Sequence, residues 1–329
     1  MGEERRGYLY GLTAYVLWGF FPIYFKLLAP SPPLEILAHR VIWSVVFVSL
    51  VLAVARNWRF LARVLRSPRL FGGITAAAVL IAINWGTYIY GVNSEHVVET
   101  SLGYFINPLV TVALAVTVLG ERLTRLQGIA VAIAATAVVV LTIDYGRPPW
   151  IALILACSFG LYGLIKKRVG VDGLQSLGFE TGFLAPLAIA YLLVIGANGS
   201  GTFTSEGSGH AALLALGGVF TAVPLMLFGA AAIRIPLTQL GLIQYLAPTL
   251  QFAIGVLIYS EPMPASRLAG FALVWVALGV FTWDAIRHTR RARFAAAADA
   301  GGDAPCDTGE HPVAGPGSPL ADEPAAARI

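Results

Sequence analysis

The chain has 329 residues, of which 57% are hydrophobic and 12% are charged, and its mean hydropathy is +0.75. Soluble globular domains carry about 25% charged residues, so this composition excludes an ordinary soluble domain and favours an integral membrane protein. The formal net charge of +4 comes from basic clusters between apolar runs. Such clusters face anionic lipid, so we expect the lipid bilayer and no nucleic acid as a partner.

Ten apolar runs of about 18–23 residues follow one another, each long enough to cross a hydrocarbon core of roughly 30 Å. They predict transmembrane helices over residues 8–28, 34–55, 70–91, 97–119, 126–143, 149–166, 174–196, 211–232, 237–259 and 267–285. The first run is a full span without a small-residue cleavage site, which is not the pattern of a cleavable signal peptide. The predicted fold class is an all-α integral membrane protein with ten transmembrane helices.

The basic residues predict how these helices are oriented. If the N-terminus is cytoplasmic, the inside segments hold the basic residues within 5–6, 56–69, 122–125, 166–168 and 287–293, together with Arg234. The outside loops hold Arg147 and Arg267. This asymmetry is what the positive-inside rule describes. It predicts a multi-pass protein of the cell membrane with both termini in the cytoplasm.

One long segment occurs twice. The stretch SLGYFINPLVTVALAVTVLGER (101–122) returns without a gap as GLIQYLAPTLQFAIGVLIYSEP (241–262), so that Pro108 recurs as Pro248. Five predicted spans separate the segment from its copy, so the two cross the bilayer in opposite directions. This is an inverted-topology repeat, and transporters built from such repeats place their substrate site at the junction of the halves.

The repeat divides the chain into parts. We predict a cytoplasmic N-terminus (1–7), a first five-helix repeat (8–144), a second five-helix repeat (145–287), and a basic end followed by a disordered cytoplasmic tail (288–329). We call the two repeats the first half and the second half. The tail after residue 294 is rich in Ala, Pro, Gly and Asp, a composition that does not support packing.

Several motifs resemble one known family. They are ILAHRVIWS (36–44), the Asn84-Trp85 pair, SLGYFINPLV (101–110), LGERL (119–123), GLIQYLAPTLQF (241–252) and the Ser260-Glu261-Pro262 turn. Together they resemble the RarD proteins, in the EamA branch of the drug/metabolite transporter superfamily. The resemblance covers roughly residues 5–290, in the same order. Ser260 stands where glycine is usual before that glutamate, and the tail after residue 294 lies outside the family pattern.

The resemblance implies several properties. They are ten helices, cytoplasmic termini, a bacterial inner membrane location, a carrier with alternating access, and an association with chloramphenicol sensitivity. It implies no particular substrate.

Ionisable side chains inside the predicted spans are the first candidates for a substrate cavity. Each costs about 2.5–3.5 kcal/mol to insert into the membrane, so such side chains tend to face the interior of the helix bundle or water. His39 and Arg40 lie on the second span, and Glu180 lies about two turns into the seventh. Extended to the first helices of each half, the repeat carries His39 onto Glu180, so we interpret them as a pseudo-symmetric pair that lines the two vestibules. The alternative is that Glu35, His39 and Arg40 form a satisfied polar cluster at the outer rim.

Further cavity candidates are polar or aromatic. They are Asn84, Trp85 and Tyr88 on the third span, and Tyr104, Asn107, Gln244 and Tyr245 beside two prolines. Such side chains suit an amphipathic or aromatic solute. Pro108 and Pro248 each remove a backbone donor, so we expect helix breaks at both. The alternatives are an interhelical hydrogen bond for Asn84 and a packing kink at each proline. Glu121 and Glu261, at span ends, are interpreted as structural.

No motif points to catalysis or to a cofactor. The chain has no HExxH, GxSxG or Walker sequence, and Cys157 and Cys306 imply neither a disulfide nor a metal site. We therefore expect no catalytic residue, no metal and no cofactor. The predicted function is a secondary transporter of small metabolites or drug-like solutes, as a monomer or a homodimer.

Two transport mechanisms and one other function remain open. Protonation of His39 and Glu180 would couple transport to protons, or Arg40 would supply a fixed charge for an anionic solute. The alternative function is a membrane-embedded enzyme or lipid scramblase at the outer-leaflet rim, for which Glu35, His39 and Arg40 are the basis.

Overall fold

The computed structural model describes residues 2–54, 59–119, 124–169, 173–232, 234–235, 240 and 243–302. These residues form helices joined by turns and short connections, without strands. The chain divides into two units, Met1–Arg287 and His288–Ile329, and the candidate cavity residues all belong to the first. The predicted all-α class is thus confirmed for the described residues.

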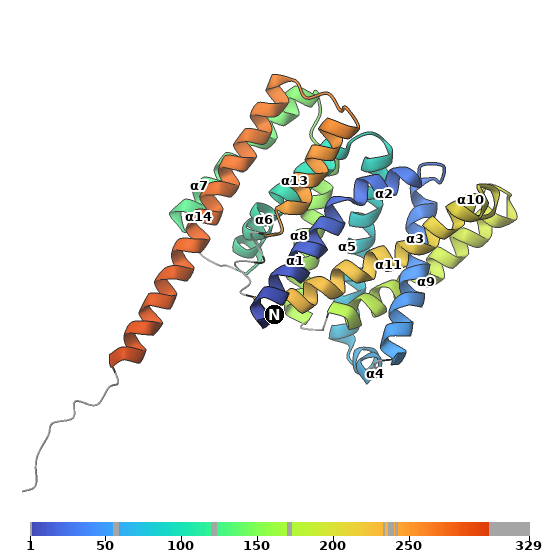
Figure 1. Cartoon of the computed structure of the whole chain (residues 1–329), viewed down its shortest axis with the longest axis horizontal. Coiled ribbons are helices and arrows are strands. Elements are labelled where there is room, and N and C mark those ends of the chain that lie inside the picture. The colour runs from blue at the N-terminus through green and yellow to red at the C-terminus, as the bar shows by residue number, and fades with distance from the viewer. Residues whose placement is uncertain are drawn as a thin grey trace, which may run out of the picture. The chain divides into compact units, whose positions relative to one another are not determined.

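The helices of the described residues follow one another along the chain as Figure 1 labels them. They are α1 (Glu3–Gly19), α2 (Phe21–Leu27), α3 (Pro33–Val54), α4 (Arg59–Arg66), α5 (Pro68–Asn93), α6 (Val97–Leu119), α7 (Arg125–Tyr145), α8 (Trp150–Val169), α9 (Gly173–Ala197), α10 (Thr202–Ser205), α11 (Gly207–Ala232), α13 (Leu246–Ala253), the π-helix η1 (Ile254–Ile258) and α14 (Ala265–Gly302).

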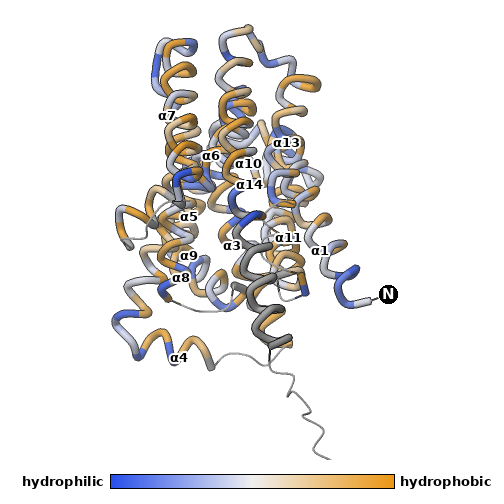
Figure 2. Tube along the Cα trace, turned by 90° about the vertical axis from the view of Figure 1, so that its left-hand side faces the viewer, coloured by the Kyte–Doolittle hydropathy of each residue, from blue (hydrophilic) through white to orange (hydrophobic). Residues whose placement is uncertain are grey.

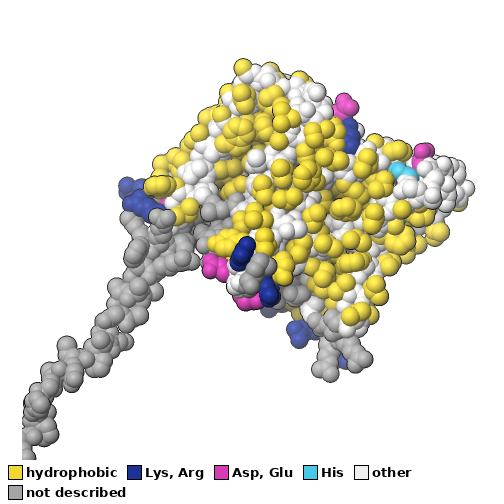
Figure 3. Space-filling model, in the orientation of Figure 1, with side chains coloured by type: hydrophobic (Ala, Val, Ile, Leu, Met, Phe, Trp, Pro, Cys, Tyr) yellow, Lys and Arg dark blue, Asp and Glu magenta, His cyan; other side chains and the backbone are white. Residues whose placement is uncertain are grey.

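Within the described part of the chain, seven helices are long and apolar enough to cross a membrane: α3, α5, α6, α7, α9, α11 and α14 as far as Asp284. Two shorter apolar stretches, Trp150–Lys166 and Leu246–Ile258, lie where the sixth and ninth spans were predicted. Hydrophobic residues run along α7, whereas hydrophilic ones mark the start of α1 (Figure 2). Large apolar side chains are exposed over the surface (Figure 3), as lipid contact requires.

The first predicted span, 8–28, is two helices and not one. α1 ends at Gly19, and Pro22 lies in the first turn of α2. A proline ring displaces the carbonyl four residues earlier, which here belongs to Trp18. The Gln251 side chain donates from Nε2 to that carbonyl oxygen over 3.0 Å. The displaced acceptor is therefore satisfied by the second half of the chain.

The two repeated prolines behave differently: α6 has no break at Pro108, whereas the ninth span is interrupted just before Pro248. α6 continues through Pro108 without interruption, because a proline in a long helix removes one hydrogen bond and leaves the others in place. Pro248 lies in the first turn of α13, where its missing N–H needs no partner. Leu240 and Ile243 are helical, residues 244–245 form a turn, and α13 begins at Leu246, so the expected helix break lies about four residues before Pro248.

The predicted tail is partly helical. α14 continues to Gly302, so the residues 295–302 belong to a helix that the composition did not predict. Residues 303–329 lie outside the described residues, as does Glu121.

Two pairs of helices that the repeat relates run antiparallel. Gly178, near the start of α9, packs against Val48 and Leu52, near the end of α3. Gly255 in η1 packs against Val98, at the start of α6. Each contact joins the start of one helix to the end of the other, as antiparallel packing requires.

The third related pair, α7 and α14, is joined at both ends by the same kind of hydrogen bond. At one end Ser266 Oγ donates to Asp144. At the other end Thr124 Oγ1 donates to Asp284 Oδ2 over 2.9 Å. Asp144 and Asp284 occupy equivalent positions in the repeat.

Close helix packing at glycines also recurs at positions that the sequence repeat relates. α8 packs against α5 and α6, as α1 packs against α11 and α13. In the first case a Cβ on Gly103 would lie 2.9 Å from the carbonyl oxygen of Ala152, and in the second Gly11 faces Ile243. The repeat carries Gly103 onto Ile243 and Gly11 onto Ala152. One helix contact is therefore present twice.

Candidate functional site

Arg40 is the most deeply buried cation of the predicted site. Arg40 lies on α3 and is 6% exposed. Its Nε donates to Thr221 Oγ1 on α11 over 2.8 Å, and the Thr221 hydroxyl donates to the carbonyl oxygen of Gly217 over 2.8 Å. Among the described residues no carboxylate lies within ion-pair distance of Arg40.

Aromatic rings surround the Arg40 guanidinium. Its Cζ lies 4.1 Å from the centroid of a Trp85 ring, 5.6 Å from Phe25 and 5.7 Å from Phe21. The negative faces of such rings attract a cation, and a desolvated contact contributes about 2 kcal/mol. We call Arg40, Thr221, Phe21, Phe25 and Trp85 the Arg40 cage.

Tyrosine and asparagine side chains extend this cage. Tyr88 packs against Phe25, with ring centroids 5.8 Å apart, and its buried hydroxyl has no hydrogen-bond partner among the described residues. Tyr104 packs against Tyr88 and donates from its hydroxyl to Asn84 Oδ1 over 3.2 Å. Asn84 Nδ2 donates to the carbonyl oxygen of Leu155 over 3.0 Å. Asn84 therefore makes the interhelical hydrogen bond that was its alternative role.

A second polar cluster lies at the start of α3. Glu35 Oε1 accepts the backbone N–H of Thr202 over 2.7 Å. Ser31 Oγ is hydrogen-bonded to Thr202 Oγ1 at 2.5 Å and to His210 Nε2 at 2.7 Å. These contacts attach α10 to the helix ends beside it. Glu35 Oε1 is thus engaged in a structural contact, but Glu35 Oε2 and His39 Nε2 have no hydrogen-bond partner among the described residues, so the satisfied cluster of the alternative interpretation is only partly formed.

His39 and Glu180 lie in separate clusters. His39 stacks on Phe203, with ring centroids 4.7 Å apart, and its Nε2 lies 3.9 Å from Glu35 Oε1. Glu180 accepts from Lys166 Nζ at 3.0 Å, Ser176 Oγ at 2.5 Å and Tyr162 Oη at 3.2 Å. Because α3 and α9 are antiparallel, the two residues lie toward opposite ends of that pair. Their joint role as vestibule residues stays a prediction.

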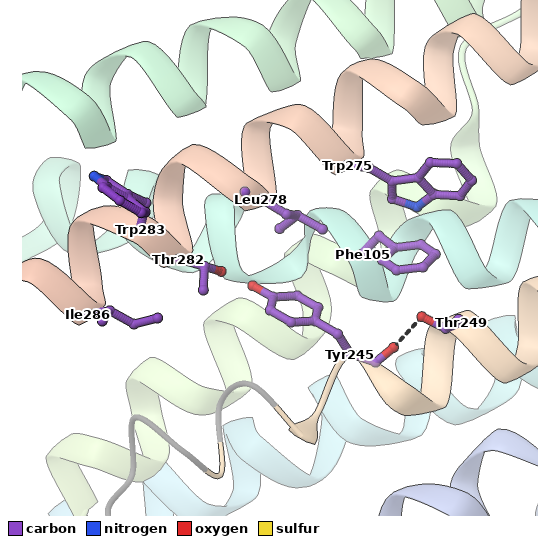
Figure 4. A pocket seen from close by; sticks show the side chains of 9 residues that line it. Phe105, Tyr245, Thr249, Trp275, Leu278, Thr282, Trp283 and Ile286 are labelled. Carbon is purple, nitrogen blue, oxygen red and sulfur yellow. Dashed lines mark hydrogen bonds between the residues drawn. The ribbon is translucent and has the colours of Figure 1, made fainter.

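Tyr245 lies away from the Arg40 cage. It lines an apolar cavity of about 520 Å³ between α6, α13 and α14, together with Phe105 and Trp275 (Figure 4). Gln244 belongs to the turn before α13. The structure thus brings Arg40, Asn84, Trp85, Tyr88 and Tyr104 together, and it places Gln244 and Tyr245 elsewhere.

Asn107 also belongs to α6, one residue before Pro108. It is partly buried, and its Oδ1 has no hydrogen-bond partner among the described residues.

Sequence reasoning missed several residues around Arg40. Phe21 and Phe25 belong to the run FFPIYF, which resembles any other apolar part of a span. Thr221 is a single hydroxyl in an apolar helix. The available signal was Pro22, because a proline inside a predicted span indicates a change of helix direction near it.

Glu261 holds the beginning of α6. Its Oε1 accepts the N–H of Val97 over 2.5 Å, and its Oε2 accepts that of Val98 over 2.9 Å. The preceding Ser260 has φ 52°, a left-handed conformation that favours glycine, and this explains why glycine is usual at that position. The geometry agrees with a structural role for Glu261.

We expect Glu261→Ala to lower the free energy of unfolding by about 1–3 kcal/mol, because two backbone donors lose their acceptor. Thermal unfolding of the detergent-solubilised protein measures this. Ser260→Gly is a suitable control, since it changes the same turn and retains the carboxylate. An unfolding temperature equal to that of the wild type in Glu261→Ala would contradict the capping role.

The stability contributed by Glu261 should depend on pH. Burial raises the pKa of Glu261 above its ordinary 4.5, although the N–H groups of Val98 and Val97 oppose the change. The folded state therefore binds the proton more tightly than the unfolded state. By linkage, stability falls as pH rises from 4.5 through the raised pKa. We expect wild-type protein to lose stability over this window relative to Glu261→Gln, and parallel curves would contradict the prediction.

The chain is similar to known proteins over most of its length. The model of the EamA-like transporter family matches residues 5–143. A protein of Streptomyces exfoliatus named Protein RarD is 55% identical over 291 residues, which are 88% of this chain and 92% of that protein. A Pseudomonas aeruginosa protein named Chloramphenicol-sensitive protein RarD is 33% identical, over 88% of this chain and 98% of that protein.

A solved crystal structure at 21% identity matches with a TM-score of 0.55, over 85% of this chain and 98% of that one. At this level of identity the likeness concerns the fold alone.

Proposed function

Because the chain belongs to the EamA-like transporter family, in its RarD group, we propose that it is a secondary transporter of small metabolites or drug-like solutes that works by alternating access. Membership of the family makes it a membrane transporter of the drug/metabolite type. The mechanism and the site are our proposal. The observation that carries them is the Arg40 cage, which joins the two halves of the chain.

Contacts between the two halves support a substrate site at the Arg40 cage. Arg40 and Trp85 belong to the first half, and Thr221 belongs to the second. The hydrogen bond from Asn84 to Leu155 also crosses between the halves. Motion of one half against the other would therefore open and close the surroundings of the buried cation.

Ten spans in two inverted five-helix halves account for the helix arrangement. The antiparallel pairs α3 with α9, α6 with η1, and α7 with α14 support this topology. So does the contact that Gly103 makes with Ala152, since Ile243 and Gly11 repeat it. The basic residues support cytoplasmic termini, in the inner membrane of a bacterium. Sensitivity to chloramphenicol, in the name of one relative, is a phenotype to test for this chain.

Proton coupling through His39 and Glu180 completes the proposal. In this structure Lys166 neutralises Glu180, so proton uptake there requires the pair to separate as the halves move. His39 has a ring nitrogen without a hydrogen bond among the described residues. Both residues would then respond to protonation in different conformations of the carrier.

The test is uptake of a labelled solute panel into proteoliposomes that contain the purified full-length chain, with and without an imposed pH gradient. We expect gradient-dependent uptake by the wild type. Glu180→Gln should fold and bind solute but lose the pH dependence of uptake. Normal pH dependence in both Glu180→Gln and His39→Ala would contradict proton coupling and leave both residues structural.

The same proteoliposomes separate transport from the alternative function. A lipid scramblase would move fluorescent lipid between leaflets without accumulating solute, and a membrane enzyme would change its substrate chemically. Glu35, on which that alternative relied, is engaged with Thr202. Lipid movement without gradient-dependent solute uptake would reject the proposed function.

A further inference from the structure

We infer that Arg40 binds the carboxylate of a monoanionic, amphipathic solute. This inference rests on the proposed function and names its substrate class. It begins from a cation that is buried between helices and has no carboxylate partner among the described residues. Buried charges in proteins are paired with an opposite charge, because an isolated one is costly to remove from water.

The described side chains that contact Arg40 do not supply a negative charge. The rings of Trp85, Phe21 and Phe25 attract the guanidinium but carry no charge. Thr221 accepts one of its five N–H donors, from Nε. The remaining donors form a planar fork that matches a carboxylate in bidentate geometry. The fork is therefore available for a ligand.

The nearest acid on the same helix, Glu35, forms no ion pair with Arg40, although its Oε2 has no hydrogen-bond partner among the described residues. Glu35 lies five residues before Arg40, and its Oε1 accepts from Thr202 N in the cluster at the start of α3. The Glu35 carboxylate also lies near the His39 ring, one turn further along α3. Glu35 thus does not neutralise Arg40.

Tyr88 supplies a second recognition group. Its residue is 2% exposed, its hydroxyl has no hydrogen-bond partner among the described residues, and its ring packs against Phe25, which also contacts the Arg40 guanidinium. A buried hydroxyl without a hydrogen-bond partner is unfavourable, and a bound ligand that forms a hydrogen bond with it would remove this cost. Arg40 and Tyr88 together offer donors to one anionic group.

The charge and the walls of the site define the solute. One cation compensates one negative charge, so a carboxylate is matched, whereas a phosphate dianion would leave a buried negative charge. The rings of Trp85, Phe25 and Tyr104 suit an apolar or aromatic remainder. The expected solute is a carboxylate attached to such a group.

Thermal unfolding of the full-length protein in detergent tests the inference directly. The probes are phenylacetate, phenylacetamide and phenyl phosphate, which share a ring and differ in charge. We expect phenylacetate at millimolar concentration to raise Tm by about 2 °C or more, and the amide and the phosphate to have little effect. An equal shift with the amide, or no shift with phenylacetate, would overturn the inference.

Variants assign the effect to Arg40. Arg40→Met should lose the phenylacetate shift and, without ligand, melt at or above the wild-type temperature, because it removes a buried unpaired charge. Arg40→Lys retains the charge without the fork and should show a smaller shift. Arg125→Met, which removes an exposed cation of α7, is the matched control and should retain the full shift. A full shift in Arg40→Met or in Arg40→Lys would overturn the inference.

Transport measurements separate this inference from the function on which it rests. Phenylacetate binding that depends on Arg40, without uptake into proteoliposomes, would reject the proposed transport and leave the carboxylate site standing. Uptake of solutes that is unchanged by Arg40→Met would reject the carboxylate site and leave transport standing.

Discussion

Gly218→Ala is expected to prevent the close packing of α3 against α11 and to reduce the yield of folded protein strongly. A Cβ on Gly218 would overlap the carbonyl group of Trp43 and lie 2.8 Å from the backbone nitrogen of Ser44. These are backbone atoms, so no side-chain rotation relieves the overlap. The helices must move apart, at a cost at or above the upper end of the roughly 1–3 kcal/mol that overpacking usually takes.

The measurement is Tm and the monodisperse fraction in detergent, with Gly229→Ala as the control. Gly229 lies on the same helix, and a Cβ there would meet no atom within 4 Å. Alanine is the better helix former by roughly 1 kcal/mol, so the control should be as stable as the wild type or more stable. Equal stability of the two variants would show that α3 and α11 are not held at this separation.

The second large effect is expected at the ion pair of Lys166 and Glu180. Glu180 is fully buried, whereas the Lys166 side chain is 18% exposed. Lys166→Met therefore leaves a buried carboxylate without a cation, and breaking a buried pair in this way costs about 3–5 kcal/mol. Glu180→Gln should cost less, because the lysine left behind reaches the surface with its flexible chain.

A double-mutant cycle checks the pair. We expect Lys166→Met combined with Glu180→Gln to recover most of the stability that Lys166→Met loses, since no charge is then left buried alone. Thermal unfolding of the four proteins measures the coupling. Additive losses would contradict the ion pair, and an unstable double variant would indicate that Ser176 and Tyr162 need the carboxylate for their own packing.

The sequence predicted the helices well and the site only in part. Apolar runs define helices because each must satisfy its backbone internally in a membrane, so their positions follow from composition. Arg40, Trp85 and Tyr88 could be found because ionisable and aromatic groups stand out in apolar spans. Thr221 could not, since a lone hydroxyl becomes a partner of Arg40 only through the packing of α11 on α3.

The pairing of His39 with Glu180 shows a different limit. The repeat relates their positions but not their surroundings. Lys166 and Tyr162 approach Glu180, whereas Phe203 and Glu35 approach His39. Positions that the sequence repeat relates therefore have different chemical surroundings, because different side chains face them.

The bonds at the two ends of α7 and α14 show what the sequence repeat keeps and what it leaves free. Asp144 accepts from Ser266, and Asp284 accepts from Thr124. The two acids occupy equivalent positions, whereas Thr124 aligns with Pro264 and Ser266 with Leu126. An isologous contact between two identical subunits would have to use the same two residues at both ends. A single chain encodes each hydroxyl separately, so either one can change position without the other.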